Sequence, residues 1–130
     1  MLFDKLSAII NKYMYGSRKE ISVLGNEKDK TINMLVKKYN LMKFRSEVDD
    51  MDQSHIIILM YKNMDTFNHQ TMKFINEYIN KRKTIIAVVP LNFDFNALVK
   101  DTKANSIDAI NWKDKNGNKF ENYIIVINKD

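Results

Sequence analysis

The sequence predicts an α/β protein in which a mainly parallel sheet carries helices on both faces. Two apolar runs, His55–Tyr61 and Thr84–Val89, show no alternation of polar and apolar residues. Each is therefore expected to be a strand that is covered on both faces. Between them, from about 67 to 82, apolar residues recur every three or four positions, which predicts a helix. A strand, a helix and a strand in so short a span form a βαβ unit with parallel strands and a right-handed crossover.

The first 16 residues predict a separate N-terminal helix. Leu2, Leu6, Ile9 and Ile10 recur at helical spacing, and Gly16 follows as a stop signal. Such a helix packs on the core of a domain or contacts a partner or a membrane surface, and one amphipathic helix does not discriminate between these roles.

The next three elements are expected to be a strand, a helix and a short edge strand. Glu20–Gly25 is a short apolar run that a glycine ends. A helical stripe follows, which Asp29 or Thr31 is expected to cap. Met42–Val48 alternates apolar and charged residues, as an edge strand does. The stripe consists of Ile32, Leu35, Val36 and Tyr39.

The C-terminal part allows two interpretations. A short helix is expected around Asn96–Lys100 and a last strand at Ser106–Trp112. Asn116-Gly117 is a turn signal that suits a hairpin, whereas the apolar spacing that follows it favours a helix over 118–128. We predict the helix, because a doubly wound sheet needs cover beside its last strand. The whole is then a flavodoxin-like, five-stranded sheet of order 2-1-3-4-5.

Composition bounds the class of protein. The chain of 130 residues predicts one domain, 1–130, with a core of its own. It has no cysteine, no apolar run long enough to span a membrane and no signal-peptide pattern at its start, so we expect a cytoplasmic protein without a membrane span. The net charge of +5 is compatible with a nucleic-acid partner. Because the lysines are spread along the chain, a solvated surface is the favoured interpretation.

The predicted topology places a ligand site outside the carboxyl ends of the first and third strands. Gly25, Asn26, Asn63 and Asn92 follow the strands that end at this edge and are the candidate binding residues. No glycine-rich phosphate loop is present, the two histidines lack metal-ligand spacing, and no metal site is predicted. The acidic residues between 47 and 52 lie at the opposite end of the expected sheet and indicate a solvated turn.

Three segments carry a further pattern: Ser54-His55-Ile56-Ile57, then Lys83-Thr84-Ile85-Ile86-Ala87-Val88-Val89-Pro90, and Ala104 through Trp112. Together they resemble the prokaryotic TIR-like domains of flavodoxin-like fold. The resemblance covers the chain from about Glu20 onward. It implies a nucleotide ligand such as NAD, and either cleavage of NAD into a signalling product or assembly with other TIR-like surfaces, in signalling or antiphage defence.

The resemblance also implies a catalytic residue. Active members carry a glutamate about ten residues before the following strand, and this position is Phe74 here. Glu77, one turn later on the same helix, is the candidate that replaces it. Its carboxylate would stabilise the positive charge that develops on the ribose as nicotinamide leaves. An NAD glycohydrolase or cyclase with Glu77 as its catalytic residue is thus one hypothesis. The alternative is a non-catalytic module that binds protein, a further copy of itself or, less favoured, nucleic acid.

Overall fold

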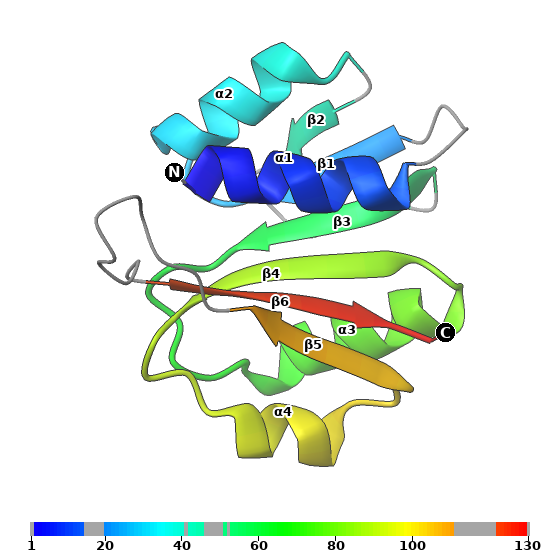
Figure 1. Ribbon diagram of the computed structural model, residues 1–130. Helices are drawn as coiled ribbons and strands as arrows, with labels where there is room; N and C mark the ends of the chain where they lie inside the picture. The colour runs from blue at the N-terminus through cyan, green and yellow to red at the C-terminus, as the bar shows by residue number, and fades with distance from the viewer. Residues whose placement is uncertain are drawn as a thin grey trace.

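In the part of the chain that the structure describes, a six-stranded mixed sheet and four helices make up the fold (Figure 1). The computed structural model describes residues 2–14, 20–40, 42–45, 51, 53–110 and 122–129. The strands are β1 (Glu20–Leu24), β2 (Met42–Arg45), β3 (Ser54–Met60), β4 (Thr84–Pro90), β5 (Ser106–Ile110) and β6 (Asn122–Asn128). The helices are α1 (Leu2–Tyr13), α2 (Lys30–Lys38), α3 (His69–Asn80) and α4 (Phe95–Asp101).

The first four strands follow the predicted order. β2, β1, β3 and β4 are neighbours in that sequence, and each pairing is parallel. The predicted N-terminal helix is confirmed as α1, which ends at Tyr13. β3 and β4 are buried over nearly their whole length, as their unbroken apolar runs predict.

The predicted end of the sheet is wrong. Residues 122–128 form strand β6, not a helix, and β6 lies between β4 and β5, antiparallel to both. The order is therefore 2-1-3-4-6-5 with six strands, not 2-1-3-4-5 with five. The spacing of Tyr123, Ile124 and Ile127 fits a helix, but the residues from Ile124 to Ile127 are all buried. A surface helix does not bury four consecutive side chains, whereas a central strand does. The hairpin signal at Asn116-Gly117 lies outside the described residues, although the β5–β6 pairing is the one that a hairpin makes.

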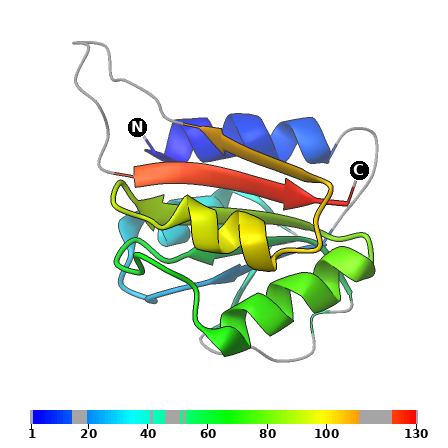
Figure 2. The ribbon, with the colours of Figure 1, turned by 90° about the horizontal axis from the view of Figure 1, so that it is seen from below.

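Two apolar layers hold the sheet between the helices. Leu6 and Ile10 of α1 and Leu35 of α2 pack with inward residues of β1, β3, β4 and β6 on one face. α3 and α4 pack on the other face, where Ile75 and Ile79 are fully buried. Figure 2 shows α1 and α3 on opposite sides of the sheet. Within the described residues no helix is long and apolar enough to cross a membrane.

Candidate functional site

The carboxyl ends of β1 and β3 border a cleft of about 420 Å³, here called the β1–β3 cleft. Its walls come from the loop after β1 and from the end of β3 with the loop that follows. Gly25, Asn26 and Asn63, three of the four predicted binding residues, lie together in it. The lining residues are Gly25, Asn26, Lys28, Asp29, Met60, Tyr61, Lys62, Asn63 and Met64.

Gly25 is the point of closest approach between β1, α2 and β3. A Cβ atom at this position would lie 2.7 Å from Ile32 Cδ1 and 2.9 Å from Met60 Cβ. Both distances are shorter than van der Waals contact. The packing of the protein itself therefore requires glycine here, whether or not a ligand approaches the same backbone.

The loop after β1 is organised by two side chains that bond to backbone N–H groups. Asn26 Oδ1 accepts a hydrogen bond from the Lys28 N–H at 2.9 Å. Asp29 caps α2, because its Oδ1 accepts from the Thr31 and Ile32 N–H groups at 2.8 and 3.1 Å. The first backbone donors of α2 are thus satisfied by a carboxylate of the protein.

An ion pair joins the two walls of the cleft. Lys62 Nζ lies 2.8 Å from Asp29 Oδ2, and the two side chains are 34% and 13% exposed. Burial acts to raise the pKa of the Asp29 carboxyl, but Lys62 and the two backbone donors outweigh it, so the pKa is lowered below its usual value. Asp29 is therefore a carboxylate at neutral pH, and its charge is compensated on both sides.

Tyr61 is the aromatic residue among those that line the cleft. It is half-buried, and burial raises the pKa of its phenol, which stays protonated at neutral pH. Its ring makes an edge contact with Phe67, whose centroid is 6.2 Å away. Phe67 in turn packs on Phe93 at 4.8 Å, so a row of rings supports Tyr61 from the core side. Asn63, two residues further, is exposed at the mouth.

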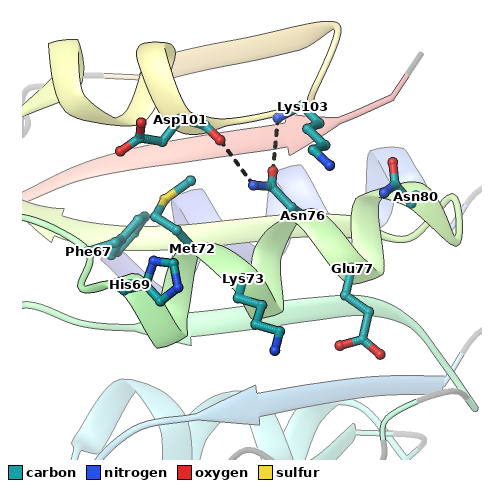
Figure 3. A pocket seen from close by; sticks show the side chains of 9 residues that line it. All are labelled: Phe67, His69, Met72, Lys73, Asn76, Glu77, Asn80, Asp101 and Lys103. Carbon is teal, nitrogen blue, oxygen red and sulfur yellow. Dashed lines mark hydrogen bonds between the residues drawn. The ribbon is translucent and has the colours of Figure 1, made fainter.

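Glu77 and Asn92 do not lie in the β1–β3 cleft. Glu77 is 55% exposed on α3 and forms an ion pair with Lys81 at 3.6 Å. It lines a separate shallow groove of about 750 Å³ along α3, here called the α3 groove. Figure 3 shows Glu77 pointing away from Asn76, which bridges α3 to the end of α4 through the Asp101 carbonyl and the Lys103 N–H. Asn92 is exposed in the turn after β4.

Sequence reasoning missed the Asp29–Lys62 pair and the ring of Tyr61. A signal for both was present, since all three residues follow the ends of the two strands that flank the topological switch point. Among the described residues, no three His, Cys, Asp or Glu side chains come together to hold a metal ion. The acidic residues between 47 and 50, and Asp52, lie outside the described part of the chain.

Comparison with known proteins finds similarity in fold alone. No protein-family model matches the sequence, and no curated protein matches it significantly. A solved protein of Thermoplasma acidophilum, designated 1320, has a TM-score of 0.53 and 11% identity over 95% of this chain and 85% of its own. The tRNA (uracil-54, C5)-methyltransferase of Pyrococcus abyssi, solved with S-adenosyl-L-homocysteine, has a TM-score of 0.53 and 14% identity. This chain covers 37% of that enzyme, which covers 97% of this chain. The similarity of this chain to both structures therefore concerns the α/β fold alone.

Proposed function

We propose that the β1–β3 cleft binds an adenosine-containing ligand without phosphate groups, of the S-adenosyl type. The observation that carries the proposal is the position of the cleft, at the carboxyl ends of two parallel strands where the sheet order reverses. Its volume of about 420 Å³ lies in the range of small-molecule sites. The methyltransferase of similar fold was solved with an S-adenosyl compound, which supports this ligand class.

The start of α2 favours a ligand that lacks phosphate. Helix N-termini bind phosphate groups because their first N–H groups point outward as donors. In this chain the Asp29 carboxylate already accepts from the Thr31 and Ile32 N–H groups. The pyrophosphate of a dinucleotide would have to displace Asp29 and break its pair with Lys62. A nucleoside with an uncharged linkage meets no such cost.

Three side chains are assigned roles in this proposal. The Tyr61 ring offers a face on which a purine base stacks. The Asn63 side-chain amide, exposed at the mouth, donates to and accepts from ribose or base edges. Asn26 is held by its bond to the Lys28 N–H and fixes the shape of the opposite wall. The proposal concerns binding and assigns no reaction.

Calorimetric titration with S-adenosyl-L-homocysteine, adenosine and NAD tests the proposal. We expect the first two to bind, and NAD to bind at least about tenfold more weakly, the cost of a lost charge-assisted hydrogen bond. Asn63→Ala should weaken binding, whereas the matched control Asn92→Ala, at the same edge but outside the cleft, should not. Binding of NAD in preference to both other compounds, or of none of the three, would contradict the proposal.

The variant Asp29→Asn tests the reason given for this preference. Asparagine still caps a helix, so the loop should keep its form. The loss of the carboxylate should narrow the difference in affinity between S-adenosyl-L-homocysteine and NAD. An unchanged ratio would show that the start of α2 does not control ligand choice.

NAD cleavage by Glu77 and TIR-like assembly stay predictions of the resemblance. Nicotinamide release, measured for the unaltered protein and for Glu77→Gln, tests the catalytic hypothesis, with Glu27→Gln as a control for a lost exposed charge. Because Glu77 lies in the α3 groove, activity that depends on it would place the substrate there and not in the β1–β3 cleft. Absence of release in the unaltered protein would end the enzymatic hypothesis.

Nucleic-acid binding is the less favoured alternative. In the described residues, α1 and α2 carry five lysines and α3 and α4 carry two, so the lysines of the helices are divided between both faces of the sheet, and α1, α3 and α4 each carry one acidic residue. A nucleic-acid site needs its cations on one face. Binding that falls steeply with salt concentration would revive this alternative.

A further inference from the structure

A third pocket lies at the opposite edge of the sheet, where β3 and β4 begin. We call it the amino-edge pocket; its volume is about 470 Å³, and its polar residues include His55, Arg82, Thr84, Ser106, Asp108 and Asn128. The β1–β3 cleft lies at the other ends of the same strands, so the two sites are separated by the length of the sheet.

Strand register places the polar floor of this pocket on one face. Ser106 pairs with Asn128 across β5 and β6, and Asp108 pairs with Val126. Ile85 pairs with Ile127, so Thr84 lies beside Asn128. Side chains two residues apart on a strand share a face. All four polar residues therefore lie on the α1 face of the sheet, to which Val126 also belongs.

Asn128 brings an unused acceptor into this floor. Its Oδ1 atom is buried and has no hydrogen-bond partner among the described residues. Buried polar atoms almost always have a partner, so an exception calls for an explanation. A ligand that carries an N–H donor would satisfy this atom.

Arg82 stands at a position where glycine is the usual residue. The end of α3 is closed by the bonds Lys83 N–H to Tyr78 O and Arg82 N–H to Ile79 O, the pattern of a Schellman motif. The residue at this point adopts a left-handed conformation, and Arg82 has a φ of 63°. A strained backbone at a pocket suggests that the side chain has a role there.

We propose that the amino-edge pocket binds a small zwitterion, a free α-amino acid. Its wall carries one guanidinium, Arg82, and one carboxylate, Asp108, beside the unused Asn128 acceptor. The α-carboxylate pairs with Arg82, for which a planar carboxylate is the preferred partner. The α-ammonium donates to Asp108 and to Asn128 Oδ1. A simple anion would meet the Asp108 carboxylate, and a simple cation would meet Arg82, so a ligand with both charges fits best.

The test is an NMR titration of the full chain, followed through its backbone amide signals. The probes are glycine and the common L-α-amino acids, each added singly, with acetate and methylammonium as half-ligands. At least one amino acid should shift the signals of Ser106, Asp108 and Asn128 saturably and leave those of Gly25 and Asn63 unchanged. It should bind at least about tenfold more tightly than either half-ligand, since each charged contact contributes.

The variant Arg82→Gly distinguishes a loss of binding from a failure to fold. Glycine is the residue that the backbone at this position prefers, so the variant should fold and yet lose about tenfold or more in affinity. Asp108→Asn should weaken binding as well. Lys81→Gln, which removes one positive charge from the preceding residue, is the matched control and should bind as the unaltered protein does.

Three results would overturn the proposal. The first is that no amino acid shifts the three signals. The second is that acetate shifts them as strongly as the best amino acid, which would make this an anion site. The third is that binding survives in both Arg82→Gly and Asp108→Asn. A titration with glycyl-glycine distinguishes a free amino acid from the ends of a peptide chain, which carry the same two charges. Binding of the dipeptide in place of every free amino acid would assign the site to chain ends and also count against the proposal.

Discussion

The variant Gly25→Ala probes the junction of β1, α2 and β3. The new methyl group would lie 2.7 Å from Ile32 Cδ1 and 2.9 Å from Met60 Cβ, with the Met60 carbonyl at 3.3 Å. Ile32 is 1% exposed and Met60 is 6% exposed, so neither can move into solvent. Overpacking of this kind typically costs about 1–3 kcal/mol. We expect about 2–3 kcal/mol here, because two of the contacts are severe and come from different elements.

A double-mutant cycle tests whether the contact with Ile32 is the cause. Ile32→Val removes the Cδ1 atom and should by itself cost about 1 kcal/mol. In the double variant the methyl group added at position 25 occupies the space that the Ile32 Cδ1 atom leaves. The loss of unfolding free energy should therefore be about 1 kcal/mol smaller than the sum of the losses in the two single variants. The free energy of unfolding is measured by urea titration with circular dichroism, and its dependence on urea should stay constant.

Ile79→Val supplies the matched control for this cycle. Ile79 is fully buried, but it packs on the α3 side of the sheet, whereas Ile32 and Met60 pack on the other side. Gly25→Ala and Ile79→Val should therefore be additive. Equal coupling of Gly25→Ala to both isoleucine variants would refute the steric argument, and a Gly25→Ala protein of unaltered stability would refute it outright.

Three further predictions concern stability. The ordinary pKa of an aspartate is 3.8, and that of Asp29 is lowered in the folded state. The stabilising effect of the Asp29 carboxylate is therefore complete above pH 3.8 and is lost as the pH falls through the folded-state pKa. Below about pH 4 the midpoint temperature of thermal unfolding should thus fall more steeply with pH for the unaltered protein than for Asp29→Asn. Parallel curves of midpoint temperature against pH would contradict this. Ser54→Ala should lower the free energy of unfolding in urea by about 1 kcal/mol, because the fully buried Ser22 hydroxyl loses its partner 2.5 Å away. An unchanged free energy would show that the hydrogen bond from Arg45 is enough to satisfy Ser22. Arg82→Gly should raise the free energy of unfolding by about 1 kcal/mol, since it relieves a left-handed backbone, and a decrease would show that side-chain contacts outweigh that strain.

Five of the six strands, and the order of the first four, could be predicted from the sequence. β3 and β4 are apolar without alternation, and only a strand covered on both faces needs such a pattern. The helix between them then fixes parallel pairing. β6 was missed because Tyr123, Ile124 and Ile127 satisfy helical spacing as well as they satisfy a buried strand. Periodicity does not separate the two for a short apolar run, and the strand pairing that decides the matter joins residues far apart in the sequence.

The location of the candidate site could be predicted, but its chemistry could not. Gly25, Asn26 and Asn63 come together because the carboxyl ends of neighbouring parallel strands must meet at one edge. Asn92 follows β4, one strand further from the switch point, and lies outside the cleft. The pairing of Asp29 with Lys62 depends on side-chain reach between two loops, and no local sequence pattern encodes that distance.

The place of β6 has a consequence for how the protein is made. The strand nearest the C-terminus occupies a central position, and both β4 and β5 depend on it for their hydrogen bonds. During synthesis one edge of β4 stays unpaired until residues 122–128 have left the ribosome, and β5 has no strand to pair with until then. An exposed strand edge is a template for pairing with other chains. Aggregation during expression should therefore respond most strongly to changes that delay or weaken this one late insertion.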